Sequence, residues 1–363
     1  MVAMRDVAKR AGVSVSTVSL VVNATGYVSD EMRERVEQAM RELDYIPNEL
    51  ARNLYRGRTG MVGVIVPTLR HPFFATLVSA LQGRLSQRNL QTLLCATDDA
   101  DTGEAEYVAR LRRHMMDGII MAAHTEHPAE YWDSIRRPIV AFDRVLGDTI
   151  AAVRSDHEQG GQLIARQLLD TGSRHAVLVG GPCKQFDDRG DGATTFPTIR
   201  YFKTLEQQCD AAGIRHEYVE SGAVSDVAGC TRVVHALFDR IESDARSGGS
   251  TMPSVDAIVG SDVVAACAVR EALSRGIRVP QDLQIIAYDG TYLADCAGRQ
   301  LTVVKQDFDT LAEQLAGHIV DAINLAGDRG DGSDGGDGNT AKPADIDIVP
   351  VSLRIGDTTR SAA

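Results

Sequence analysis

The first part of the chain repeats apolar residues at the spacing of amphipathic helices. Between Met4 and Asn23, two short runs each place small or branched apolar residues on one helical face, three or four positions apart. Gly12 between the runs suits a left-handed turn, and Ser14 is a suitable N-cap for the second helix. A third helix is expected from about Asp30 to Asp44. The pattern predicts a helix-turn-helix whose second helix enters the major groove of DNA. The alternative is a helix-turn-helix that only packs inside an α-helical domain.

From residue 61 the pattern changes to short apolar runs that alternate with stretches of helical length. Runs of this kind are typical of buried parallel strands. The expected strands of a first set are Met61–Val66, Thr92–Ala96, Gly118–Met121 and Ile139–Phe142. Those of a second set are Ala176–Gly180, a strand at Tyr218, Ala257–Val259 and Gln284–Ala287. The pattern therefore predicts two doubly wound α/β lobes, which bind ligands outside the carboxyl ends of their strands.

Polar and aromatic side chains gather at those predicted strand ends. Carboxylates accept hydrogen bonds from vicinal hydroxyls, an arginine donates a planar fork, and an aromatic face covers the apolar side of a sugar ring. Each residue alone also has an ordinary explanation as a helix cap, a turn or part of the core. Together they predict one ligand cleft, whose candidate residues are Phe73, Phe74, Asp143, Arg144, Ser261, Asp262 and Asp289.

The charge of the chain is acidic overall but unevenly distributed. The formal net charge is −12 over 363 residues, yet residues 1–59 hold nine Arg or Lys against eight Asp or Glu. The cations near the two ends of this segment are Arg5, Lys9, Arg10, Arg52, Arg56 and Arg58. Because the segment as a whole is not basic, DNA binding must depend on where these cations lie.

The cysteines and the N-terminus argue against a metalloprotein and against a membrane protein. The six cysteines form no C-x-x-C pair, and no spacing of Cys and His residues suggests zinc, so we expect neither a metal nor a cofactor. The N-terminus is charged, and no apolar run reaches the ~18 residues that a membrane span needs. We therefore expect a cytoplasmic protein without a membrane partner.

Longer motifs link both parts of the chain to a known family. The segment YIPNELARNL, from Tyr45 to Leu54, resembles the hinge helix of the lactose/galactose-repressor family. The resemblance continues through IVPTLRHPFF, GGPCK, VGSDVVAACAV, VPQDLQIIAYDG, LTVVKQDF and VPVSLRIGDTT. It implies an N-terminal all-α helix-turn-helix headpiece and a two-lobed α/β body like the type I periplasmic binding proteins, with doubly wound parallel sheets.

The resemblance also implies domain boundaries. The headpiece would take residues 1–46, the hinge helix and linker residues 47–59, and the effector-binding and dimerisation domain residues 60–363. Within that domain, lobe 1 would comprise about 60–156 and 307–325, and lobe 2 about 157–306 and 340–357.

Roles in the headpiece follow from the same resemblance. The family reads bases mainly with the first, second and sixth residues of its recognition helix, here Val15, Ser16 and Leu20. Since two of these are apolar, we expect thymine-methyl contacts and few bidentate hydrogen bonds. Leu54 matches the wedge that each hinge helix inserts into the minor groove, although a lone leucine in a helix is normally core. The other residues expected to touch DNA are Arg5, Thr17, Asn23, Tyr45, Asn48, Ala51 and Tyr55.

In the body, the resemblance adds two cleft residues and exposes departures from the family. Arg200 matches the arginine of the family's R-L-x-G-F segment, here RYFKTL, and Gln306 lies in the KQDF segment. His157 stands where the family usually has Asn. The loop from Lys184 to Thr195 is longer and richer in Asp and Gly than is typical. A second Gly/Asp tract, residues 327–338, lacks the spacing of a calcium loop and is interpreted as a flexible surface insertion.

Together these features favour a transcriptional repressor that binds a palindromic operator as a homodimer, with a sugar as the expected effector. Two alternatives of the same class stay open: a purine-type effector that acts as a corepressor, stacked on Phe73 or Phe74, and a global carbon-catabolite regulator. An enzyme is disfavoured because the sequence has no G-x-S-x-G elbow, phosphate-cradling loop or metal-ligand spacing. A transport-linked binding protein is disfavoured by the headpiece and by the lack of an export signal.

Overall fold

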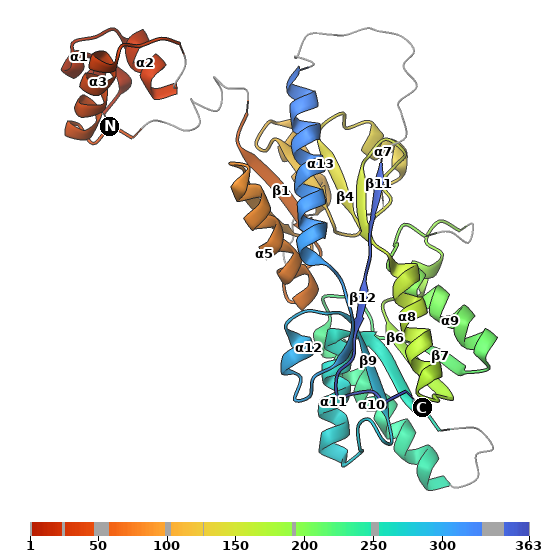
Figure 1. The fold of residues 1–363 in the computed structure, drawn as a ribbon. Coiled ribbons are helices and arrows are strands. Elements are labelled where there is room, and N and C mark those ends of the chain that lie inside the picture. Colours follow the sequence, from red (N-terminus) through yellow and green to blue (C-terminus); the bar gives the residue numbers. More distant parts are fainter. Residues whose placement is uncertain are drawn as a thin grey trace. The chain divides into compact units, whose positions relative to one another are not determined.

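The chain divides into two compact units, residues 1–60 and residues 61–363, which we call the headpiece and the body. The computed structural model describes residues 2–23, 26–46, 58–98, 103–125, 127–190, 194–247, 254–328 and 345–362. Both units are drawn in Figure 1. Each is described by itself below.

The headpiece consists of three short helices packed around a small apolar core. They are α1 (Met4–Ala11), α2 (Val15–Asn23) and α3 (Asp30–Glu42). Gly12 ends α1 with a φ of 67°, in the left-handed region. Ser14 Oγ then accepts a hydrogen bond from the Thr17 N–H at 3.0 Å, which caps α2. The fully buried centre is formed by Val7, Val18 and Val36, one from each helix. The helix-turn-helix and third helix predicted from the sequence are therefore confirmed.

The turn of this motif is held from the outside by α3. The Arg35 guanidinium donates from Nη2 to the carbonyl oxygens of Ala11 at 2.5 Å and Gly12 at 3.3 Å. These carbonyls lie at the C-terminus of α1, where a cation also opposes the negative end of the helix dipole. The angle between α1 and α2 is thus fixed by a side chain that neither helix supplies.

Lobe 1 of the body is a six-stranded parallel sheet with helices on both faces. The strand order is β11-β5-β4-β3-β1-β2. The strands are β1 (Met61–Val66), β2 (Gln91–Ala96), β3 (Gly118–Met121), β4 (Ile139–Phe142), β5 (Ala152–Ser155) and β11 (Ile346–Val349). The helices are α5 (Pro72–Gln87), α6 (Glu104–Arg112), α7 (Ala129–Asp133) and α13 (Phe308–Asp328). Figure 1 shows α5 and α13 side by side over one face of this sheet.

Alternation of the side chains along the strands of lobe 1 explains why both faces of its sheet are covered. On β4, Val140 and Phe142 pack in the cluster that includes α5 and α13, whereas Ile139 and Ala141 pack in the opposite cluster around Trp132. Successive side chains of a strand point to opposite faces, so a continuous apolar run buries both faces of the sheet.

Lobe 2 has the same architecture. Its strand order is β12-β10-β9-β8-β6-β7, and β12 alone runs antiparallel to its neighbour β10. The strands are β6 (His175–Gly180), β7 (Arg215–Glu220), β8 (Ala257–Ser261), β9 (Gln284–Asp289), β10 (Thr302–Lys305) and β12 (Ser352–Arg354). The helices are α8 (His157–Asp170), η1 (Cys183–Phe186), α9 (Ile199–Ala212), α10 (Val227–Ser247), α11 (Asp262–Arg275) and α12 (Leu293–Cys296).

The chain passes between the lobes after β5, after β10 and between β11 and β12. Residues 340–357 were predicted for lobe 2, but β11 pairs with β5 in the sheet of lobe 1, and β12 pairs with β10 in lobe 2. Pro350 separates the two strands, and a residue without an N–H cannot continue a strand ladder. The Gly/Asp tract at residues 327–338 lies outside the described residues, except for its first two positions.

None of the helices in the described part of the chain is long and apolar enough to cross a membrane.

Candidate functional site

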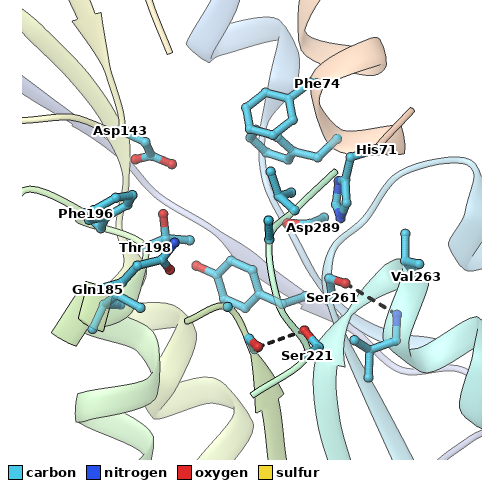
Figure 2. Close-up of a pocket in the computed structure, with 18 of the residues that line it drawn as sticks. His71, Phe74, Asp143, Gln185, Phe196, Thr198, Ser221, Ser261, Val263 and Asp289 are labelled. Carbon is cyan, nitrogen blue, oxygen red and sulfur yellow. Dashed lines mark hydrogen bonds between the residues drawn. The ribbon is translucent and has the colours of Figure 1, made fainter. Parts of the chain in front are cut away.

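A cavity of about 210 Å³ lies between the two lobes, at the carboxyl ends of their strands. Figure 2 shows residues of both lobes pointing into it. Of the candidates named from the sequence, those that line the cavity are Phe73, Phe74, Asp143, Arg144, Ser261, Asp289 and Gln306. The structure therefore brings together side chains that are far apart in the sequence, while their role in ligand binding stays a prediction.

One wall of the cavity is aromatic and comes from the start of α5. Phe73 stacks on Phe142 at 5.9 Å and meets Phe74 edge to face at 5.2 Å between ring centroids. Both rings also belong to the core of lobe 1, and Phe74 lies beside His71, with ring centroids 6.1 Å apart (Figure 2). Burial lowers the pKa of His71 to about 4, so its ring is neutral at pH 7. Its Nδ1 is buried with no hydrogen-bond partner among the described residues.

Two buried carboxylates provide the polar side of the cavity. Asp143 follows β4 with a φ of 44°, and Asp289 ends β9 with a φ of 134°. Non-glycine residues rarely adopt these values, and such strain is characteristic of positions where the chain must aim a side chain. Burial, followed by the nearby Asp262 carboxylate, raises the pKa of Asp289 well above its ordinary value.

Gln306 links Asp289 of lobe 2 to Ser155 of lobe 1 through two hydrogen bonds. Its Nε2 donates to Asp289 Oδ1 at 3.0 Å, and its Oε1 accepts from Ser155 Oγ at 2.6 Å. Ser155 ends β5 in lobe 1, whereas Asp289 belongs to lobe 2. The chain Ser155–Gln306–Asp289 is therefore a buried hydrogen-bonded link between the lobes.

His157 forms a second buried link, which the sequence did not assign to the site. Its Nε2 lies 2.9 Å from Asp143 Oδ1 in lobe 1, and its Nδ1 lies 2.7 Å from the Tyr288 hydroxyl in lobe 2. The Tyr288 ring stacks on Tyr201 with centroids 4.1 Å apart and planes at 11°. From the sequence, His157 was noted only because it stands where the family usually has Asn. An imidazole presents two ring nitrogens on opposite sides, so it can join two partners here.

Two predicted residues lie elsewhere. Arg200 does not line the cavity; its Nη1 pairs with Glu158 Oε1 at 2.7 Å, and the side chain is 45% exposed. Asp262 does not line it either, because it is fully buried beneath the loop that follows β9. Its carboxylate accepts hydrogen bonds from the Thr291 N–H at 2.6 Å and the Thr291 hydroxyl at 2.7 Å. Asp262 therefore shapes the loop next to Asp289 instead of facing a ligand.

The cavity also contains residues that the sequence analysis missed. Gly180 and Gly181 at the end of β6, and Ser221 after β7, line it from lobe 2. Strand-end position was the available signal, but β7 has the polar sequence RHEYVE and was located only through Tyr218. The remaining polar and aromatic lining residues that were not site candidates are His71, Phe142, Gln185, Phe196, Thr198, Tyr201, Phe202, Asp226 and Tyr288.

The headpiece presents part of its predicted DNA-reading surface. Val15 is 45% exposed and Ser16 is exposed on the first turn of α2, while Leu20 is half-buried. Asn23, in contrast, is buried, and its Nδ2 donates to Ser19 Oγ at 3.1 Å, so the position predicted to contact the DNA backbone faces the protein.

Other headpiece candidates have mixed surroundings. Arg5 is exposed on α1. Thr17 hydrogen-bonds through its hydroxyl to Ser14 at 2.8 Å, and Tyr45 packs half-buried against the headpiece core. The predicted hinge contacts Asn48, Ala51, Leu54 and Tyr55 lie outside the described residues.

The architecture is that of a helix-turn-helix headpiece joined to a two-lobed ligand receptor. The family described as bacterial regulatory proteins, lacI family, matches residues 3–48. Periplasmic binding proteins and sugar binding domain of LacI family matches residues 59–186, and periplasmic binding protein-like domain matches residues 165–359.

Relatives match nearly the whole chain. The ribose operon repressor of Halalkalibacterium halodurans is 34% identical over 311 residues, which cover 84% of this chain and 86% of the relative. The sucrose operon repressor of Lactococcus lactis subsp. lactis is 30% identical over 324 residues, covering 89% of this chain and 94% of the relative. The chain therefore belongs to the LacI family and is a DNA-binding transcriptional regulator, as predicted, and not an enzyme.

A solved structure agrees on the fold. The Lac repressor dimer bound to operator and the anti-inducer ONPF superposes with a TM-score of 0.76 at 24% identity and covers 99% of both chains. This likeness confirms the predicted headpiece and two-lobed body.

Proposed function

We propose that this protein is a repressor that binds a palindromic operator as a homodimer and changes its operator affinity when a small sugar binds between its lobes. The ribose and sucrose operon repressors among its relatives support a sugar. The observation that carries the proposal is the cavity itself, which is lined by Asp143, Asp289 and Phe74, with Asp143 across from Phe74 (Figure 2). Carboxylates accept hydrogen bonds from sugar hydroxyls, and an aromatic ring covers the apolar face of a sugar ring.

The charges around the cavity favour a neutral, hydroxyl-rich ligand. Arg144 already donates from Nε to the Ala123 carbonyl at 3.1 Å and from Nη1 to the Asp143 carbonyl at 2.5 Å. Those two donors are therefore not available to a phosphate or carboxylate. His71 is neutral at pH 7, so it offers no positive charge to an anionic ligand. The volume of about 210 Å³ is below the roughly 300–1,000 Å³ typical of drug-sized ligands, which favours a single-ring sugar.

A thermal-shift screen of the purified full chain tests the effector. The panel is D-ribose, D-xylose, D-glucose, D-fructose and sucrose, with hypoxanthine and guanine as the purine arm. A ligand that binds only the folded state raises the melting temperature. We expect one of the sugars to raise it and Asp289→Asn to abolish the rise. Asp148→Asn, an exposed change in lobe 1, is the matched control and should keep it.

The panel also separates the competing regulators. A rise with a purine alone would replace the sugar by a purine corepressor. A global carbon-catabolite regulator would respond to none of these sugars as specific ligands, and its operator affinity would be unchanged in their presence. Either result contradicts the proposal.

The link from the cavity to DNA is proposed to pass through residues 47–59 as a hinge helix. A helix of this length is marginal in water and orders only when it is docked, so lobe closure can bias its formation. Leu54→Ala should weaken operator binding at least about tenfold by removing the minor-groove wedge, while sugar affinity stays within about twofold. The measurement is fluorescence anisotropy on operator DNA selected with the wild-type protein, and an unchanged operator affinity would reject the wedge.

The base-reading role of Val15, Ser16 and Leu20 is part of the same proposal. The exposure of Val15 and Ser16 on the first turn of α2 supports it, since this end of a recognition helix contacts base edges. We also propose the cytoplasm as the location, because operator DNA lies there.

A further inference from the structure

The segment between β6 and α9 crosses from lobe 2 to lobe 1 at the mouth of the cavity. We call residues 183–198 the strap; its described residues are 183–190 and 194–198. It begins in lobe 2, where the Cys183 N–H donates to Glu220 Oε2 at 2.9 Å. It reaches lobe 1 at Thr195, whose carbonyl accepts from the Val145 N–H at 3.3 Å. The strap is the long Gly/Asp-rich loop of the sequence, and it makes a direct connection between the lobes.

Hydrogen bonds inside the strap fix the position of its lobe-1 end. The Asp188 carboxylate accepts from the Thr195 N–H at 2.8 Å and from the Thr195 hydroxyl. The Thr194 hydroxyl donates to the Gln185 carbonyl at 2.5 Å and accepts from the Phe196 N–H at 3.0 Å. These side chains bond back to the strap, and the strap contacts lobe 1 through the Thr195 carbonyl and the Phe196 ring.

Phe196 contacts two side chains of lobe 1, His124 and Arg144. Its ring stacks on His124 with centroids 4.8 Å apart and planes at 28°. The Arg144 guanidinium carbon lies 4.7 Å from the Phe196 ring centroid, a cation–π distance. Both Phe196 and Arg144 are buried, which strengthens such a contact because water does not screen it. The two lobes therefore meet through an aromatic side chain at the cavity wall.

We propose that Phe196 is a specificity-determining residue of the effector cavity, which limits the ligand to a single sugar ring. This inference rests on the proposed sugar effector. Figure 2 shows Phe196 and Phe74 on opposite sides of the cavity, so a ring between them would have an aromatic side chain on each side. Arg144 contributes by holding Phe196 in place, and two of its donors, Nε and Nη1, are bonded to carbonyl oxygens. Phe196 and Thr198 of the strap line the cavity, whereas Arg200, which was predicted to, does not.

Three variants separate the size of Phe196 from its aromatic surface. Phe196→Ala removes the phenyl ring and enlarges the cavity, whereas Phe196→Leu fills much of the space without an aromatic face. Phe186→Leu is the matched control on the same strap: Phe186 packs on Tyr218 at 4.9 Å in lobe 2 and does not line the cavity. Calorimetric titrations with the single-ring sugar that binds wild type, and with sucrose, give the affinities.

The expected pattern is specific to the proposal. Both Phe196 variants should bind the single-ring sugar at least about tenfold more weakly, equivalent to about 1.4 kcal/mol. Only Phe196→Ala should gain sucrose binding relative to wild type, and Phe186→Leu should stay within about threefold for both sugars. Wild-type affinity and selectivity in Phe196→Ala would overturn the inference.

Hydrogen exchange measured without sugar tests the role of Phe196 separately from the proposed sugar effector. Amide hydrogen exchange at Val145 should become faster in Phe196→Ala and not in Phe186→Leu, because the bond to Thr195 depends on strap docking. If no sugar binds wild type, the proposed effector is wrong, and with it the size limit on a sugar ring. Unchanged exchange at Val145 would overturn the role of Phe196 in joining the lobes, whatever the ligand.

Discussion

Tyr288→Phe tests whether the buried link through His157 stabilises the body. The Tyr288 hydroxyl lies 2.7 Å from His157 Nδ1, and both residues are almost fully buried, at 1% and 0% exposure. The substitution keeps the ring stacked on Tyr201 and removes only the oxygen. A buried polar atom that loses its partner costs about 1–3 kcal/mol. The free energy of unfolding should fall by that amount.

Urea denaturation of the full chain measures this loss. With a slope of about 3 kcal/mol per M, the midpoint should fall by about 0.3–1 M. Circular dichroism follows both lobes, whereas the fluorescence of Trp132, the single tryptophan, reports lobe 1. Since His157 joins Tyr288 to Asp143 of lobe 1, both signals should shift.

The control is Tyr292→Phe, the same chemical change at a side chain that is 65% exposed. Surface substitutions of this kind stay within about 0.5 kcal/mol. If Tyr288→Phe unfolds at the same urea concentration as Tyr292→Phe, the hydroxyl contributes nothing and the reasoning fails. A shift seen by circular dichroism alone would show that the link does not couple the lobes.

Two further predictions concern the turn of the headpiece and the acidic groups of the body. Gly12→Ala should destabilise the headpiece by about 1–2 kcal/mol in thermal unfolding, because φ is 67° and the new Cβ would lie 2.9 Å from Arg35 Nη2; an unchanged transition would contradict this. Burial raises the pKa of Asp262 to about 6, so its stabilising proton is fully held below about pH 4 and lost as the pH rises through 6. The stability of wild type minus that of Asp262→Asn should therefore fall by on the order of 2 kcal/mol from about pH 4 to pH 7. Burial lowers the pKa of His71 to about 4 and gives the opposite slope in that range, and the difference removes this contribution. The difference reports Asp262 together with Asp289, whose pKa Asp262 raises, and a flat difference would refute the assignment.

The parts of the fold that the sequence predicted are those with a local signal. The strand MVGVIV at β1 is a continuous apolar run because both its faces are buried, and such a run can be recognised without a structure. The edge strands β11 and β12 are short, partly exposed and polar at alternate positions. Their assignment to different sheets depends on pairing with β5 and β10, which are distant in sequence.

The site shows the same division. Asp143 and Asp289 were found because they follow recognisable strands. The role of His157 could not be found this way, since it depends on partners on β9 and after β4 that only tertiary packing brings together. Arg200 was misplaced because it lies at the second position of α9 and pairs with Glu158, whereas Phe196 and Thr198 just before it line the cavity.

The passage of β11 into β12 has a consequence for how this molecule can be cut or recombined. Neither lobe is encoded by one uninterrupted stretch of the gene, so exchanging a lobe with that of a relative requires matched junctions at all the crossing points. A stop codon placed just before Ile346 would remove one strand from each sheet at once. The carboxyl-terminal residues therefore belong to both lobes, and a small deletion there would damage both sheets together.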